Sequence, residues 1–195
     1  MDPASIGHES MIVLGKHSGR AAFADALTKL GLHLEDADFQ RAFDRFKELA
    51  DRKGEIGEEG IRAIVAEETS MGSEEMTLVS IHFAGGSDET PVATITLDRD
   101  GERVEISAEG DGMVNASFVA VQDAYGIAAT LADYRVSPLT SGADAMAKVD
   151  VIVQVGDTTY SGQGVSTDVV EGSARAMVAA MNKAAFGRSV VGDGA

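Results

Sequence analysis

The sequence predicts an α+β fold, in which a small helical subdomain precedes a pseudo-symmetric (βββα)2 domain. Apolar residues recur every three or four positions between residues 15 and 68, which indicates helices. After residue 76 they alternate with polar residues, which indicates strands. The polar segment "TSMGSEE", residues 69–75, separates the two patterns and is the predicted linker. In the second part a strand-strand-strand-helix order occurs twice, which is the basis for the pseudo-symmetry.

Three helices are predicted in the first part. Ser18 can cap the first helix, and Gly31 can end it. Asp36 can cap the second helix, and Gly54 can end it. A short third helix is predicted over residues 58–68. The apolar stripes of these helices need partners, so we expect them to pack on one another.

Six strands and two helices are predicted in the second part. Each strand candidate is an alternating run bounded by turn residues. The predicted strands are 76–85, 91–98, 102–109, 131–140, 146–155 and 158–165, and the predicted helices are 111–126 and 167–186. Thr167 or Asp168 is the expected cap of the last helix. Residues 187–195 are expected to form a loose tail.

An ungapped offset of 56 residues aligns the two units of the second part. Ile95 falls on Val151, and Ser117 falls on Ser173. Because identities are few, the repeat is inferred mainly from the pattern. Two such units usually pair around a pseudo-twofold axis, with the helices on one face of the sheets. The other face would need a partner, so a homodimer is expected.

The composition argues against several classes of partner. Asp and Glu number 32 against 16 Lys and Arg, and the net charge of −16 repels nucleic acid and anionic membranes. Cysteine is absent, so disulfide and thiol chemistry are not expected. The first residues lack a signal-peptide pattern and no run could cross a bilayer, which favours the cytoplasm. The dispersed acidity suggests a halophilic source, and ordinary solubility through net charge is the alternative.

The sequence offers few residues for independent catalysis. The four histidines stand at none of the close spacings that bind a metal, so no metal site is expected in this chain. A G-x-S-x-G nucleophile motif is absent, although a Ser-His-Asp arrangement stays open. "LGKHSGR", residues 14–20, lacks the spacing of a phosphate loop. It is either a capped helix start with solvated charges, or a segment whose His17 and Arg20 reach into another chain's active site.

"EGDGMVNAS", residues 109–117, places two glycines just before a helix. Exposed N–H groups there can receive a carboxylate, helped by the helix dipole. The alternative is a tight strand-to-helix turn that needs glycine for its backbone angles. "GQGVSTD", residues 162–168, stands at the equivalent point of the second unit. Two such turns in a dimer would suit an amino-acid pocket.

These segments resemble a known family. "LGKHSGRAAFADALTKLGLHLEDADFQRAFDRFKELADRKGEI" resembles the segment after the catalytic barrel of 2-isopropylmalate synthases and the related citramalate synthases. "EGDGMVNASFVAVQDAYG" and "YSGQGVSTDVVEGSARAMVAAMNKA" resemble their C-terminal allosteric domain. The resemblance implies that the catalytic barrel, with its divalent metal, belongs upstream. This chain would then be a shortened gene product, an isolated domain or a subunit of a split enzyme, with no cofactor of its own.

The resemblance also implies a role for each segment. Residues 1–14 would lead in from the barrel, 15–68 would be a communication subdomain, and 76–186 would be an allosteric dimerisation domain. His17 would reach toward the active site of a partner chain, whose barrel lies in cis or in a separate chain. The effector pocket would use the glycine turn and the following strand, with glycine N–H groups on the effector carboxylate. Its implied residues are Gly110, Asp111, Gly112, Val114, Asn115, Leu131, Tyr134, Pro138 and Ala145.

The expected function follows from the same resemblance. The full enzyme would condense acetyl-CoA with 2-oxoisovalerate, or with pyruvate in the citramalate case. This chain would bind leucine for feedback inhibition and mediate dimerisation, and would be inactive alone. The alternatives are the same region of a citramalate synthase that senses isoleucine, a stand-alone amino-acid-binding protein, and a dimerisation domain with an empty pocket.

Overall fold

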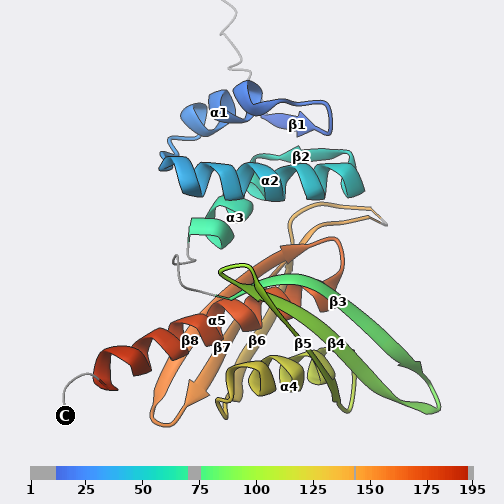
Figure 1. Cartoon of the computed structure of the whole chain (residues 1–195). Coiled ribbons are helices and arrows are strands. Elements are labelled where there is room, and N and C mark those ends of the chain that lie inside the picture. The colour runs from blue at the N-terminus through green and yellow to red at the C-terminus, as the bar shows by residue number, and fades with distance from the viewer. Residues whose placement is uncertain (1–11, 70–75, 143, 193–195) are drawn as a thin grey trace, which may run out of the picture.

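The computed structural model describes residues 12–69, 76–142 and 144–192, and shows a helical part stacked on two splayed sheets (Figure 1). The elements of the helical part are β1 (Val13–Gly15), α1 (Arg20–Lys29), α2 (Asp36–Lys53), β2 (Glu55–Gly57) and α3 (Glu58–Thr69). Those of the second part are β3 (Thr77–Gly86), β4 (Glu89–Arg99), β5 (Glu102–Glu109), α4 (Met113–Tyr125), β6 (Thr130–Pro138), β7 (Ala147–Val155), β8 (Thr158–Ser166) and α5 (Val169–Gly192). The predicted α+β class is confirmed.

The predicted helix ends in the first part are confirmed. Gly31 follows α1 with φ of 69°, and Gly54 follows α2 with φ of 92°. Glycine adopts a positive φ without a Cβ clash, so both positions can stop a helix and reverse the chain. After Gly31, the Leu32 N–H bonds back to the Leu27 carbonyl (2.9 Å), which satisfies one of the last helical acceptors.

Two predicted caps in the first part are wrong, and one in the second part is confirmed. Gly19 is the N-cap of α1, while the Ser18 hydroxyl accepts the Gly15 N–H (3.0 Å) and closes the preceding turn. Asp36 is the first residue of α2 rather than its cap. Asp168 does cap α5, since its Oδ1 accepts the N–H of Val170 at 2.7 Å.

The helical part contains a two-stranded sheet that the sequence pattern did not predict. β1 and β2 pair antiparallel, with Leu14 opposite Ile56. Both side chains are buried in the core of the helical part. Each strand has only three residues, which is too short for an alternating pattern to be recognised. The pairing places "LGKHSGR" against the end of α2.

The second part repeats itself in strand register as well as in element order. Ile95 of β4 pairs with Ile106 of β5, and Val151 of β7 pairs with Gly162 of β8. Both partners in the second unit stand 56 residues after those in the first, and the two helices also begin 56 residues apart. The predicted offset is therefore confirmed for the second and third strands and the helix.

The first strand of each unit carries a matching irregularity. Leu78 of β3 stands opposite Leu97, and Leu131 of β6 stands opposite Val153. A shift in register follows directly after each leucine. Because Leu97 and Val153 are equivalent by the offset, Leu78 and Leu131 are equivalent positions of the repeat. The connection after the first strand accounts for the different spacing.

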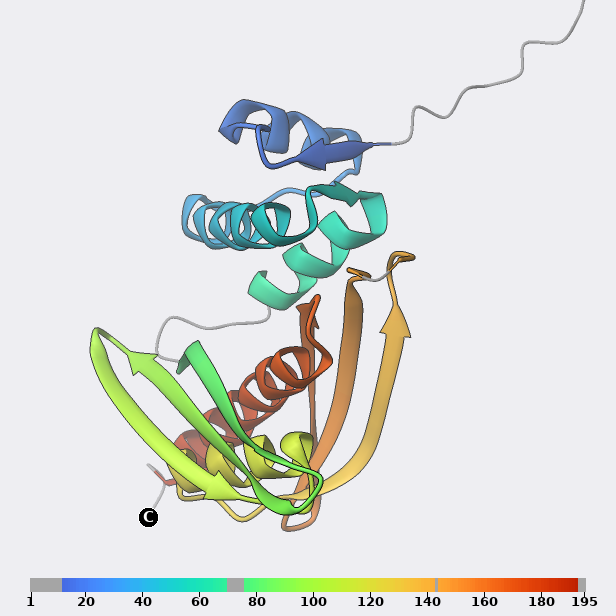
Figure 2. The ribbon, with the colours of Figure 1, turned by 90° about the vertical axis from the view of Figure 1, so that its right-hand side faces the viewer.

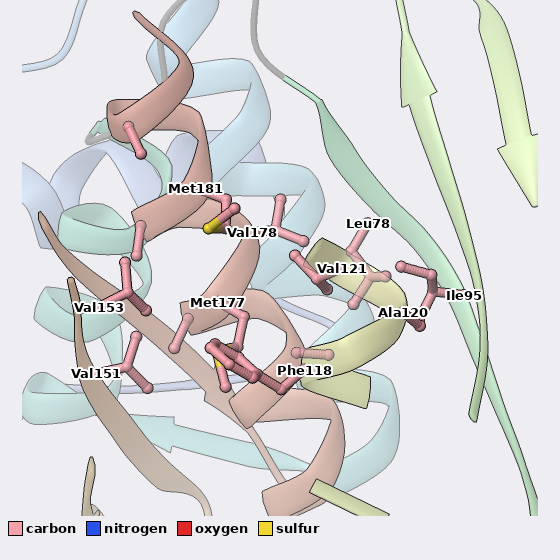
Figure 3. Close-up of a cluster of buried hydrophobic side chains, with 14 of the residues drawn as sticks. Leu78, Ile95, Phe118, Ala120, Val121, Val151, Val153, Met177, Val178 and Met181 are labelled. Carbon is pink, nitrogen blue, oxygen red and sulfur yellow. The ribbon is translucent and has the colours of Figure 1, made fainter. Parts of the chain in front are cut away.

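The two helices pack between the sheets and on each other (Figure 2). α4 covers the inner face of the sheet β3-β4-β5, and α5 covers that of β6-β7-β8. Phe118 and Val121 of α4 meet Met177 and Met181 of α5 in one buried cluster, which also takes in Ile95 (Figure 3). This single core holds both units together.

The outer faces of the sheets are mostly polar, so they are not the surfaces that most need a partner. On the first sheet, for example, the hydroxyls of Thr94 and Ser107 bond to each other at 2.7 Å. Apolar side chains are also exposed on the inner face, at strands that the helices do not cover. Val136 of β6 and Val104 of β5 stand opposite buried residues, yet they are 39% and 41% exposed.

Two residues of the second part are buried in the core of the helical part. Met146, before β7, and Val165 of β8 are fully buried among the helical residues. Three predicted segments lie partly outside the described residues. They are the lead-in, of which most is outside, the linker at positions 70–75 and the tail at positions 193–195. Helix α5 continues to Gly192, so the tail predicted to be loose from residue 187 is helical over most of its length.

Candidate functional site

The turn from β5 into α4 brings the backbone unusually close to the helix. A Cβ on Gly110 would overlap the Ala116 backbone, so only glycine fits there. The Gly110 N–H donates to the Pro91 carbonyl at 3.0 Å, within the first sheet. That donor is already used, and it is not one of the groups that could hold a ligand carboxylate.

The N-terminus of α4 presents backbone donors toward solvent. The first helical bond runs from the Ala116 N–H to the Gly112 carbonyl (2.8 Å), so the N–H groups of Met113 and Val114 lie outside the ladder. Gly112 is the N-cap residue, with an extended backbone and no side chain that could cap them. These donors and the helix dipole favour an anion at this point.

Polar side chains frame the same turn. Asn115 Oδ1 accepts the Asp111 N–H at 3.1 Å, which fixes the turn against the helix. The Asp111 side chain is exposed beside it. An acceptor for an ammonium group therefore stands next to donors for a carboxylate.

A cavity of about 790 Å³ opens between this end of α4 and the start of β6. Val114, Phe118, Leu131 and Met177 supply much of its apolar surface. Its full lining is Asp111, Gly112, Met113, Val114, Asn115, Phe118, Val119, Gln122, Ala129, Thr130, Leu131 and Met177. We call this cavity the α4/β6 pocket. It combines an apolar wall with a few convergent polar groups, as small-molecule sites do.

Five of the predicted pocket residues meet here, and a sixth supports them. Asp111, Gly112, Val114, Asn115 and Leu131 line the α4/β6 pocket. Gly110 lies behind the turn. The structure thus brings together residues from the turn, the helix and the next strand.

The other three predicted pocket residues lie elsewhere along β6 and its connection. The Tyr134 hydroxyl bonds to Ser173 Oγ (2.7 Å) of α5. Pro138 ends β6, and Ala145 sits in the turn before the buried Met146. None of the three lines the pocket among the residues that the structure describes.

Sequence reasoning missed several lining residues. Phe118 and Gln122 follow Val114 at four-residue steps, so the helical period could have identified them. Gln122 also accepts the Ala129 N–H at 3.1 Å, which joins α4 to the entry of β6. Met177 comes from the helix of the other unit, and no local signal could have revealed it.

His17 lies in a second cavity, far from the α4/β6 pocket in the fold. Its side chain is exposed in the turn after β1, in a hollow of about 620 Å³ formed with the end of α2. Lys16, Arg52 and Lys53 share that hollow. Arg20 does not reach into it as a free side chain, because its guanidinium bonds to Gln40 and stacks over the Phe39 ring.

The described residues contain no candidate metal site and no candidate membrane-spanning helix. Over residues 12–69, 76–142 and 144–192, no group of three or more His, Cys, Asp or Glu side chains could hold a metal ion. No helix in this part of the chain is long and apolar enough to span a membrane.

Two protein families together match most of the length of the chain. Residues 55–185 match the family described as the LeuA allosteric (dimerisation) domain, and residues 1–54 match the family described as homocitrate synthase post-HMGL domain-like. The first match begins at β2, so it includes α3 as well as the (βββα)2 part.

Curated relatives named 2-isopropylmalate synthase match nearly the whole chain. The protein of Acidimicrobium ferrooxidans is 47% identical over 95% of this chain, that of Pelotomaculum thermopropionicum 42% over 94%, and that of Pyrococcus furiosus 40% over 94%. The chain spans only 36–37% of the length of these relatives and corresponds to their C-terminal part. The resemblance found in its motifs is thereby confirmed, and the chain belongs to the LeuA allosteric (dimerisation) domain family.

Proposed function

We propose that this chain is the regulatory and dimerisation part of a 2-isopropylmalate synthase, and that its α4/β6 pocket binds leucine. The observation that carries the proposal is the uncapped N-terminus of α4 at the mouth of an apolar cavity. A zwitterionic amino acid with a branched apolar side chain matches both features. The domain family and the names of the relatives support the same conclusion.

The internal repeat provides a reference for the open helix end. Asp168 is the repeat equivalent of Gly112, and it caps α5 by accepting the N–H groups of Val170 and Glu171. At α4 the same position is glycine and has no side-chain cap. One unit therefore satisfies its helix donors internally, whereas the other leaves them for a carboxylate.

The rest of the pocket suits the other groups of leucine. Asp111 stands beside the turn and can attract the ammonium group. Val114, Leu131 and Met177 offer apolar contacts for the isobutyl group. Isoleucine differs by the position of one methyl group, worth only about 1–3 kcal/mol in such a pocket. Isoleucine binding, as in a citramalate synthase, is the second candidate.

The test is a calorimetric titration of the chain and its Gly112→Asp variant with leucine and isoleucine in high-potassium buffer. The new carboxylate would cap α4 as Asp168 caps α5, and would exclude the ligand carboxylate. A Cβ at Gly112 meets no atom within 4 Å, so the variant is expected to fold. Gly19→Asp is the matched control, because it adds the same cap and charge at the N-cap of α1.

The expected result is saturable leucine binding by the parent chain and the control, with at least about a tenfold loss in Gly112→Asp. Tighter binding of isoleucine would move the chain to the citramalate branch. If the folded parent binds neither amino acid, the effector proposal fails and a dimerisation domain with an empty pocket remains. Equal leucine affinity in the parent and in Gly112→Asp would mean that the carboxylate is held elsewhere.

The activity of the whole enzyme is also a proposal. We place a catalytic barrel in cis or in a separate chain, with a divalent metal held there, and assign it the condensation of acetyl-CoA with 2-oxoisovalerate. Leucine would act through linkage, by favouring one arrangement of the domains. We further propose that this takes place in the cytoplasm.

His17 is proposed to reach the active site of a partner chain. Its exposure in the turn after β1 leaves it free to do so. Replacing it by alanine in an enzyme that carries its barrel should lower turnover or weaken acetyl-CoA binding. Unchanged kinetics would leave His17 as a solvated turn residue.

A further inference from the structure

The α4/β6 pocket has a counterpart in the other unit of the repeat. A cavity of about 150 Å³ lies between α5 and β3, and we call it the α5/β3 pocket. Three of its lining residues stand at repeat positions that line the larger pocket. The equivalent pairs are Leu131 and Leu78, Asn115 and Glu171, and Val119 and Arg175.

The two pockets differ in which parts of the chain line them. Glu48 and Arg52 of α2 line the α5/β3 pocket, whereas no residue of the helical part lines the α4/β6 pocket over the described ranges of the chain. Arg52 Nη1 donates to Glu171 Oε2 at 2.5 Å, and its Nη2 donates to Glu48 Oε1 at 2.8 Å. A guanidinium from the helical part thus lies at the α5/β3 pocket, whereas the lining of the larger α4/β6 pocket has no such group.

The side chains around Arg52 form a connected ionic network across the interface between the helical part and the second part, which we call the joint. Arg175 Nε lies 3.1 Å from Glu171 Oε1, on the same helix. Arg45 is buried and bonds to both Glu48 Oε2 (2.6 Å) and the Val165 carbonyl of β8. Charge-assisted bonds of this kind are directional and strong where water is partly excluded. They join α2 to both α5 and β8.

The repeat substitutions fit this use of the pocket. Asn115 and Val119 in the open pocket are neutral, whereas Glu171 and Arg175 in its counterpart are charged. Burial would raise the pKa of Glu171, but the hydrogen bond from Arg52 and the charges of Arg175 and Arg45 outweigh it and lower the pKa. Glu171 is therefore ionised at neutral pH, as a partner for Arg52 must be.

We propose that the α5/β3 pocket is the docking site of the helical part, with the Arg52 side chain as its resident ligand. One half of a duplicated pocket then takes a free small molecule, and the other half takes a side chain of the same chain. Loss of Arg52 removes its two paired bonds from the contact between α2 and α5, which weakens that contact and widens the range of positions that the helical part adopts. The proposal needs no effector, so it stands or falls separately from leucine binding.

The test measures the distance between the two parts by pulsed electron paramagnetic resonance. The chain has no cysteine, so Asp25→Cys on α1 and Glu102→Cys on β5 give one spin-label pair. Arg52→Ala is compared with the parent in this labelled background. Arg52 is 43% exposed, so its truncation is expected to leave the fold intact, as circular dichroism would verify. Arg62→Ala is the matched control, because Arg62 is similarly exposed and, within the part of the chain that the structure describes, its guanidinium pairs only with Glu58 of the same helix.

The expected result is a distance distribution at least about twofold broader in Arg52→Ala, with the parent and Arg62→Ala alike. Arg52→Lys, which keeps the charge but loses the paired bonds, should fall between. Equal distributions in all folded variants would overturn the proposal. A variant that loses helix content throughout would also contradict it, since Arg52 would then support the fold rather than the docking.

Discussion

At the scale of single residues, glycine decides the geometry of the candidate site at two neighbouring positions for different reasons. Gly110 is required because the helix backbone passes too close for a Cβ. Gly112 has room for a side chain and an extended backbone that any residue adopts. Its value lies in leaving the helix donors uncapped. Structure thus explains Gly110, and the proposed ligand explains Gly112.

Gly110→Ala should destabilise the chain, because the added methyl group meets backbone that cannot rotate away. We expect a loss of at least about 2 kcal/mol in the free energy of unfolding, measured by urea denaturation. Gly112→Ala is the control and should change stability by less than about 1 kcal/mol. Similar losses in both variants would show that the close approach at Gly110 relaxes easily.

At the scale of elements, α3 brings two adjacent carboxylates into the joint between the parts. Glu67 and Glu68 are both buried. Glu67 Oε2 accepts the Val165 N–H of β8 at 3.2 Å, and Arg175 and Arg45 lie within 4 Å of its oxygens. Burial raises the pKa of Glu67 against the opposing effect of these arginines. Two carboxylates and two arginines thus share one poorly solvated joint.

Glu68 should make stability depend on pH. Burial, and then the charge of Glu67, raise the pKa of Glu68 from 4.5 to about 7, against the opposing charges of Arg175, Arg45 and Arg41. Because the folded chain binds this proton more tightly than the unfolded chain, the contribution of Glu68 is greatest below about pH 4.5 and is lost as pH rises through 7. Glu68→Gln should remove this loss and be more stable at pH 8, by at most about 3 kcal/mol.

The measurement is the urea-unfolding free energy of Glu68→Gln and the parent between pH 5 and 8, with Glu59→Gln on the exposed face of α3 as control. Glu171 has the opposite sign, since its lowered pKa costs stability only on acidification below its ordinary range. A parent whose stability rises steadily from pH 5 to 8 would contradict the assignment to Glu68.

At the scale of the whole molecule, the two units share one core, but their inner faces are incompletely covered. Val104, Leu131 and Val136 lie on the helix-covered side of the sheets and are still 37–41% exposed. Leu131 joins this surface to the α4/β6 pocket. In a dimerisation-domain family, a second copy is the natural cover for such a surface.

The halophilic source suggested by the net charge stays a prediction.

Val136→Asp should weaken the dimer, because it places a charge in the apolar surface that a second copy would bury. We expect at least about a tenfold rise in the dimer dissociation constant, measured by light scattering over a dilution series. Ile152→Asp is the control, since Ile152 is 37% exposed but lies on the outer face of β7. Equal weakening by both variants would place the interface elsewhere.

The order and type of the longer elements, the repeat and the family could all be predicted from local patterns in the sequence. The hydrophobic period, the turn glycines and the motifs are local properties, so they can be recognised in the sequence alone. The errors lay in local contacts that compete closely, such as Ser18, which closes a turn instead of capping a helix. The short pairing of β1 with β2 also left no pattern to read.

Which residues line a common pocket could be read only from the folded structure. Asp111, Asn115 and Leu131 line the α4/β6 pocket together, whereas Pro138 and Ala145 do not line it. Met177 reaches the same pocket from the helix of the other unit. The folded structure also showed that Arg52 of α2 lines the second pocket of the repeat and bonds to Glu171 there. The physical reason is that a cavity depends on contacts between segments far apart in the chain, and their spacing is set by packing rather than by local propensity.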